Sequence, residues 1–241
     1  MSSTTAAVTS HGYESGRTVY AEQVNREKLM FWSEAASIQL LYSGVHPYEY
    51  NIPDGCDPTY IKLVLNFIEA TDPKDPAELT YKNLCKANPG VTIPNTFKAM
   101  VTFHASAEQL DLNRKLKGTS LRDHILLLIK TKPLELSDFF FLMETLERID
   151  KDLCWRALDQ TIFFYTRESG LRKNWGKPIE LNYLVSWCDK RGWGKEVREK
   201  IEKIEAPKRA RKEKEAAERE AAQRAKLEKN DANFPGLGKG K

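Results

Sequence analysis

Long apolar runs and paired cysteines are both missing from this sequence. No segment approaches the ~18–20 consecutive apolar residues that a membrane-spanning helix requires. Segment 1–16 is rich in Ser, Thr and Ala and has no hydrophobic stretch, so we expect no signal peptide. The cysteines are scattered singly, which predicts free thiols in a reducing cytoplasm, with nuclear entry left open. They are Cys56, Cys85, Cys154 and Cys188.

Motifs of catalysis, metal binding and cofactor binding are also missing. The sequence has no Gly-x-Ser-x-Gly elbow and no Gly-rich phosphate loop, and no cysteine has a second within four residues. His11 falls in the polar N-terminal segment, and His124 falls in an amphipathic segment, where a partly buried side chain is the simpler interpretation. We therefore expect no enzyme activity, no cofactor, no metal and no small-molecule substrate. Catalytic partners far apart in the sequence would escape this test.

Charge is distributed unevenly along the chain. Segment 206–241 holds 11 Lys and Arg against 6 Asp and Glu, a net charge of +5. The whole chain has 38 basic and 34 acidic residues. Residues 1–205 therefore hold 27 basic and 28 acidic residues, a net charge of −1. A near-neutral body excludes a uniformly basic nucleic-acid binder and still allows a local basic patch.

Apolar periodicity predicts helices through most of the chain. In a helix predicted over Glu22–Tyr42, four apolar residues at spacings of three and four share one face. Asp57 is expected to cap a helix that runs to about Ala70. Similar capping and breaking patterns place further helices at 76–86, 106–118, 121–131, 137–148, after Asp150, after Pro178 and after Gly192. Only Val91–Ile93 and Met100–Phe103 are strand-like.

The predicted fold is therefore all-α, with a two-lobed helical body. We expect a disordered arm over 1–20, because a polar segment cannot bury enough surface to offset its ordering entropy. An N-terminal helical lobe over 21–90 and a six-helix lobe over 91–205 follow. The charged tail over 206–241 has no apolar stripe, and a helix that is polar all round is solvated, bridging or marginally stable.

Basic and aromatic residues gather between positions 167 and 198. Eight cations face four acidic residues there, and Trp175 and Trp193 lie among them. Cations that neutralise phosphates beside rings that stack on bases are what single-strand binding requires. The alternative is that the tryptophans anchor the core or turns and the cations form a solvated rim. The predicted nucleic-acid-binding residues are Arg167, Arg172, Lys173, Trp175, Lys177, Lys190, Arg191, Trp193, Lys195 and Arg198.

A second basic cluster opens the tail. It could direct nuclear entry, contact RNA or simply solvate the tail. Its members are Lys208, Arg209, Arg211 and Lys212.

Two functions remain open at this point. The favoured one is a non-enzymatic RNA-binding assembly protein, a nucleocapsid-like or ribonucleoprotein subunit that binds RNA and a protein partner or copies of itself. The alternative is a helical protein–protein interaction adaptor of death-fold size with no nucleic-acid role. Phosphate-driven binding weakens steeply with salt, whereas apolar helix docking does not, so ionic strength separates the two.

Overall fold

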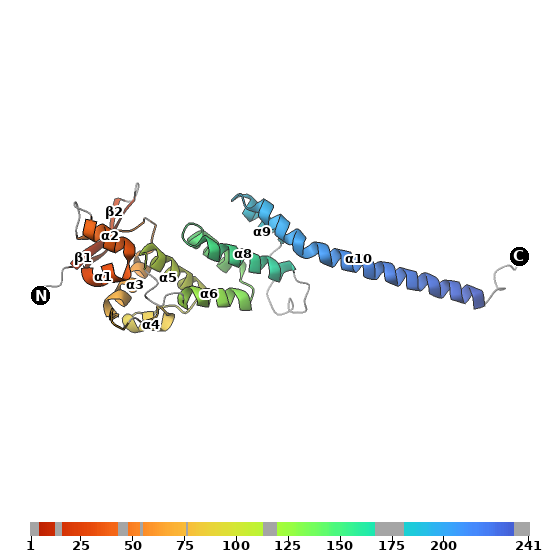
Figure 1. The fold of residues 1–241 in the computed structure, drawn as a ribbon, viewed down its shortest axis with the longest axis horizontal. Coiled ribbons are helices and arrows are strands. Elements are labelled where there is room, and N and C mark those ends of the chain that lie inside the picture. The colour runs from red at the N-terminus through yellow and green to blue at the C-terminus, as the bar shows by residue number, and fades with distance from the viewer. Residues whose placement is uncertain are drawn as a thin grey trace. The chain divides into compact units, whose positions relative to one another are not determined.

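A computed structural model describes residues 5–12, 16–42, 48–53, 55–75, 77–112, 120–166 and 181–233. Figure 1 shows the order of the elements along the chain. The strands are β1 (Thr5–Gly12), β2 (Gly16–Asn25) and β3 (Glu49–Asn51). The helices are α1 (Arg26–Trp32), α2 (Glu34–Tyr42), α3 (Pro58–Ala70), α4 (Tyr81–Ala87), α5 (Phe97–Gln109), α6 (Ser120–Thr131), α7 (Leu136–Leu146), α8 (Lys151–Thr166), α9 (Leu181–Asp189) and α10 (Gly194–Asn233).

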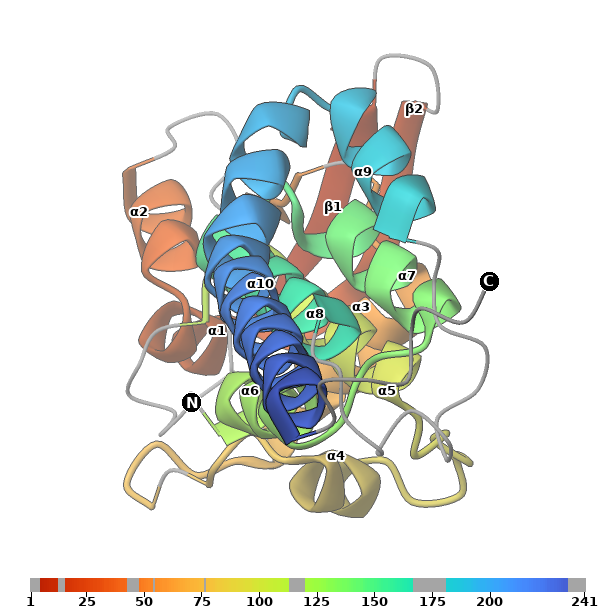
Figure 2. The same ribbon diagram turned by 90° about the vertical axis from the view of Figure 1, so that its right-hand side faces the viewer.

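A small mixed sheet at the N-terminal end shows that the all-α prediction is wrong. Its strand order is β2-β1-β3, with β1 antiparallel to β2 and parallel to β3. The two longer strands lie side by side in Figure 2. The predicted disordered arm therefore contains the central strand of a sheet.

Burial explains why this polar segment is ordered. Ala6 and Val8 of β1 are buried, as are Tyr20 and Val24 of β2. Thr9 and Ser10 of β1 are buried as well, but their hydroxyls have partners. Thr9 Oγ1 donates to Glu49 Oε1 at 2.6 Å, and Ser10 Oγ shares a hydrogen bond of 3.1 Å with Tyr20. These partners come from β2 and β3, so the segment read alone gives no indication of them.

The helix predicted over Glu22–Tyr42 is two helices. Residues 22–25 belong to β2, and Ser33 takes an extended conformation between α1 and α2. The Ser33 hydroxyl accepts a hydrogen bond of 3.0 Å from Ala36 N, which satisfies an amide at the start of α2. The predicted apolar face is nonetheless confirmed, because its four residues are buried: Leu29, Trp32, Ala36 and Leu40.

The N-termini of α3 and α4 show where capping patterns succeed and fail. Asp57 caps α3 as predicted, since its carboxylate accepts from the amides of residues 59 and 60. The helix expected from residue 76 begins instead at Tyr81, where the Thr80 hydroxyl accepts from Asn83 N at 3.2 Å. Nearby residues offer competing caps, and tertiary packing decides which one is used.

α5 overturns two further predictions. Met100–Phe103 is helical rather than strand-like, and Ser106 lies buried inside α5 instead of capping a later helix. Val91–Ile93 forms no strand. α5 packs against α3, α6 and α7, with Phe103 in T-shaped contact with Tyr60 of α3. The apolar contacts on several sides of α5 outweigh the local β preference of its residues.

The next three helices lie close to their expected positions. α6 ends two residues before Pro133, and α7 begins at Leu136 with Glu135 as its N-cap in place of the predicted Ser137. Asp150 caps α8 as predicted, because its Oδ1 accepts from Leu153 N at 3.0 Å.

The contacts divide the chain into two compact units, residues 1–161 and 162–241. Within the second unit, α9 packs on the start of α10 through the buried residues Leu184, Cys188 and Val197. In the described parts of both units, no helix combines the length and the apolarity that membrane crossing requires.

Candidate nucleic-acid interface

The turn between α9 and α10 brings the predicted basic and aromatic residues together. Trp193 N donates to Cys188 O at 2.9 Å and Gly192 N donates to Asp189 O at 3.1 Å, the two bonds of a Schellman motif. Gly192 holds φ at +79°, a conformation in which a Cβ atom is strained. The predicted interhelix turn at Gly192 is confirmed.

Gly194 makes the start of α10 fit against α9. A Cβ atom at this position would lie 1.7 Å from Asp189 Oδ1. The same carboxylate forms an ion pair with Arg198, one turn into α10. The turn is therefore fixed by its backbone, by close packing and by one ion pair, so its side chains stand on a rigid support.

Two tryptophan rings and one guanidinium group form the centre of this surface. Trp187 and Trp193 meet edge to face, with ring centroids 6.2 Å apart and planes at 68°. Arg191 Cζ lies 3.8 Å from the centroid of Trp187, a cation–π contact. All three side chains are partly exposed. A guanidinium plane on an indole face extends the flat surface and adds a positive charge to it.

Two lysines flank this centre. Lys190 and Lys195 are exposed, and neither forms an ion pair with a described side chain. Arg198 is already neutralised by Asp189. The cations of this turn are thus the two exposed lysines and Arg191, which is already stacked on Trp187. We define Trp187, Lys190, Arg191, Trp193 and Lys195 as the turn surface.

Four of the ten predicted residues belong to this surface, Arg198 lies just beyond it, and the other five lie outside the described residues. Lys190, Arg191, Trp193, Lys195 and Arg198 lie on the turn or the first turns of α10. Sequence reasoning missed Trp187, although its position four residues before Arg191, near the end of α9, was the available signal. The other predicted members lie outside the described residues: Arg167, Arg172, Lys173, Trp175 and Lys177.

The basic cluster of the tail is partly engaged within the chain. Arg209 pairs with Glu202, and Arg211 Nε lies 2.8 Å from Glu215 Oε1. Lys208 donates to the Thr166 carbonyl oxygen. Lys212 is exposed. The cluster therefore offers an RNA less free positive charge than its sequence suggests.

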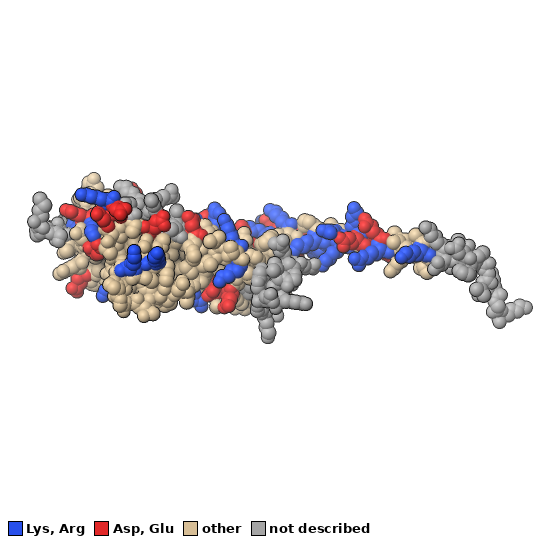
Figure 3. Space-filling view, turned by 90° about the horizontal axis from the view of Figure 1, so that it is seen from below, with Lys and Arg blue, Asp and Glu red and all other residues tan. Residues whose placement is uncertain are grey.

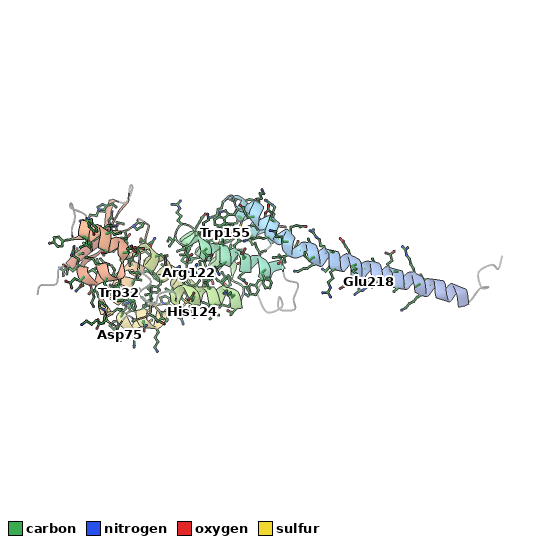
Figure 4. All side chains as sticks on the ribbon, viewed as in Figure 1. Trp32, Asp75, Arg122, His124, Trp155 and Glu218 are labelled. Atoms are coloured by element: carbon green, nitrogen blue, oxygen red, sulfur yellow. The ribbon has the colours of Figure 1, made fainter. Side chains whose placement is uncertain are left out.

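A different polar cluster, partly buried in the first unit, joins α5, α6 and the start of α8. Arg122 lies on α6 with His124 two residues further along (Figure 4). Asp150 Oδ2 is 2.9 Å from His104 Nε2 and 2.6 Å from Arg122 Nε. Because an ionised carboxylate only accepts hydrogen bonds, the histidine donates. Burial by itself raises the pKa of Asp150, but the hydrogen bonds from His104, Arg122 and Leu153 N outweigh it and hold the pKa well below its usual range.

This cluster pairs a histidine with a carboxylate as an acid–base dyad does, but it lacks the solvent access and the free carboxylate oxygen of a catalytic dyad. The His104 side chain is only 4% exposed, and Asp150 is occupied on both oxygens. The nearby thiol of Cys154 is buried, and burial together with Asp150 and Glu147 raises its pKa to about 12, so it stays protonated. The arrangement favours a structural clamp between three helices over a catalytic centre.

The part of the chain that the structure describes contains no candidate metal site. No group of three or more His, Cys, Asp or Glu side chains is arranged to hold an ion there. The four cysteines are free, as predicted, and three of them are buried.

The chain matches no protein-family model, no curated protein and no solved structure.

Proposed function

We propose that this chain is a non-enzymatic RNA-binding protein, a nucleocapsid-like or ribonucleoprotein subunit, that binds single-stranded RNA at the turn surface. One observation carries the proposal. Two partly exposed indole rings, the Arg191 guanidinium stacked on one of them and two exposed lysines share a turn whose backbone is fixed by the Schellman motif.

The chemistry of the turn surface suits a single strand. Indole and guanidinium planes stack on any base, and lysine ammonium groups neutralise phosphates. The surface is preformed, so little side-chain ordering is needed when RNA binds. The wider charge supports the same proposal, since residues 162–241 hold 21 basic and 13 acidic residues, a net charge of +8.

Two variants of the turn surface test the proposal with a labelled single-stranded RNA at several salt concentrations. Trp193→Ala should weaken binding by about 1–3 kcal/mol and leave the salt dependence nearly unchanged. Lys195→Ala should weaken binding across sequences and reduce the slope of log K against log salt by about 0.7 to 1.

A matched control comes from an exposed lysine of the first unit. Lys82→Ala removes the same charge from α4 and should leave both affinity and slope unchanged. Circular dichroism melting checks that the variants fold. Wild-type protein without salt-dependent RNA affinity, or turn variants that behave like Lys82→Ala, would overturn the proposal.

A protein-only adaptor remains the second candidate, because the outer side of α2 exposes apolar residues. Ile38, Leu41 and Tyr42 are all more than half exposed. An adaptor would hold its partner at high salt and would show no salt-dependent RNA affinity.

A further inference from the structure

α2 is apolar on two opposite sides. Ala36 and Leu40 are buried against the body of the first unit. Ile38, Leu41 and Tyr42, at spacings of three and four, lie together on the outer side and are 55%, 54% and 81% exposed. A cluster of large apolar side chains on one exposed helix face is typical of an interaction site. We call these three residues the α2 face.

The α2 face is held rigidly by hydrogen bonds at three points. Asp111 accepts from Ala35 N at 2.8 Å, and Arg26 donates to Leu40 O at 2.7 Å. The Gln39 side chain bonds both the N–H and the carbonyl oxygen of Asn51, each at 3.0 Å. Gln39 thus satisfies the hydrogen-bonding groups of an outward-facing residue of the edge strand β3. A partner would therefore contact a rigid helix rather than an unpaired strand edge.

The N-terminal segment that contains the α2 face is acidic, which disfavours nucleic acid as its partner. Residues 1–80 hold 5 Lys and Arg against 11 Asp and Glu, a net charge of −6. Glu34 is exposed on the same helix. Phosphates would be repelled from this region, whereas a cationic protein surface would be attracted to it.

The second half of α10 is a cationic helix with an exposed surface. Residues 209–227 are exposed throughout, apart from a half-buried Glu215. Segment 206–233 holds 9 basic and 6 acidic residues, a net charge of +3, and Figure 3 shows the two signs interleaved along the helix. Ion pairs one turn apart, such as Lys214–Glu218 and Arg224–Glu220, support the helix in water.

The uncharged residues of this half are small. Alanines let a second helix approach closely, and the exposed Leu227 adds one large apolar side chain. The alanines stand at positions 210, 216, 217, 221, 222 and 225. We call residues 209–227 the arm.

We propose that the α2 face of one copy binds the arm of a second copy. The apolar residues of the α2 face would pack on the alanines and Leu227, and the acidic surroundings would attract the Lys and Arg residues. Face and arm are different surfaces, so a pair of copies joined by one contact still has one of each, which can close the assembly on itself or bind a further copy head to tail. This inference supplies the contact for the self-assembly part of the proposed function, and it rests on none of the turn-surface residues.

Light scattering on full-length protein freed of RNA by nuclease tests the contact. Wild-type protein should grow in mass with concentration. Leu41→Lys places a cation in the α2 face, and the double variant Arg219→Glu/Lys226→Glu reverses two charges of the arm. Each should be monomeric where wild type assembles. Leu127→Lys, at a leucine of α6 that is likewise 55% exposed, is the matched control and should assemble like wild type.

Mixing the two monomeric variants gives the sharpest result. The Leu41→Lys copy keeps an intact arm and the double variant keeps an intact face, so the mixture should form a dimer of one of each and grow no further. Assembly by the double variant alone would mean that two α2 faces pair with each other and would overturn the arm as the occupant. A monomeric wild type, assembly by Leu41→Lys equal to that of Leu127→Lys, or a mixture without dimers would also overturn the proposal.

RNA affinity separates this inference from the proposed function. Leu41→Lys should bind a single short RNA as wild type does, because its change lies far in sequence from the turn surface. Loss of assembly with intact RNA affinity supports both proposals. Assembly in protein that has no RNA affinity would leave the contact supported and the RNA function refuted.

Discussion

The segment 5–12 and the second half of α10 are both polar and both lack a continuous apolar stripe, yet they differ in the structure. Residues 5–12 form β1, the central strand of the sheet, and their hydroxyls are paired with β2 and β3. Residues 209–227 form a solvated helix that depends on its own ion pairs. Polarity alone therefore does not distinguish a packed strand from an exposed arm.

The difference comes from the size and charge of the polar side chains. Thr9 and Ser10 are small, and one hydrogen bond satisfies each hydroxyl in the interior. Lysine, arginine and glutamate carry full charges on long side chains, and burying them costs far more unless every charge is paired. A Ser/Thr/Ala segment can enter a sheet at little cost, whereas the charged segment remains in water.

Removing residues 1–12 should have the largest effect on stability. The deletion takes away the central strand and the burial of Val8, worth about 1.5–3 kcal/mol, together with ladder hydrogen bonds worth about 0.5–1.5 kcal/mol each. We expect loss of cooperative unfolding, or a melting temperature many degrees lower, by circular dichroism. Val8→Asp should act in the same direction without shortening the chain. An unchanged melting curve would mean that β1 is dispensable.

Asp150→Ala should have the second-largest effect on stability. It leaves Arg122 and His104 without their carboxylate and removes the N-cap of α8, a loss of about 3–5 kcal/mol for breaking a buried pair. Asp152 also pairs with Arg122, but it is exposed. Asp152→Ala is therefore the control and should leave the denaturant midpoint almost unchanged. Equal effects of the two substitutions would refute the clamp.

Acid should weaken the clamp in a predictable direction. The pKa of Asp150 is depressed in the folded state, so its contribution to stability is present above the unfolded-state value of about 4 and is lost as pH falls towards the folded-state pKa. The free energy of unfolding of wild-type protein should therefore decline below about pH 4. Asp150→Asn should be less stable at neutral pH and should decline less steeply. Parallel pH profiles for the two proteins would contradict the assignment.

Removing Glu213–Lys241 should have the smallest effect. The deleted part of α10 that the structure describes is almost entirely exposed, so the melting temperature of RNA-free protein at low concentration should change by less than about 2 °C. A larger decrease would show that the arm packs on its own chain.

The elements that sequence could predict have local determinants. Asp57-Pro58 and the stripe of Ile61, Leu65 and Ile68 define α3 within a dozen residues. Gly192 marks the α9–α10 turn, and Lys190 and Trp193 were found because basic and aromatic residues are dense in the short segment around it.

The elements that sequence could not predict depend on distant partners. β1 pairs with β3 some 40 residues away, and His104 meets Asp150 across 46 residues. No pattern within either segment encodes such a contact. The capping residues of α4 and α5 were misplaced for a related reason, because several Ser, Thr and Asp residues can serve as caps and packing selects among them.

Hydrogen exchange on the intact, RNA-free protein tests the contrast between the two ends most directly. Amides of β1 should exchange only with global unfolding of the first unit, since this strand is central in the sheet. Amides of residues 213–227 should exchange orders of magnitude faster at low protein concentration, because local fraying exposes them. Exchange of β1 as fast as that of residues 213–227 would contradict the account.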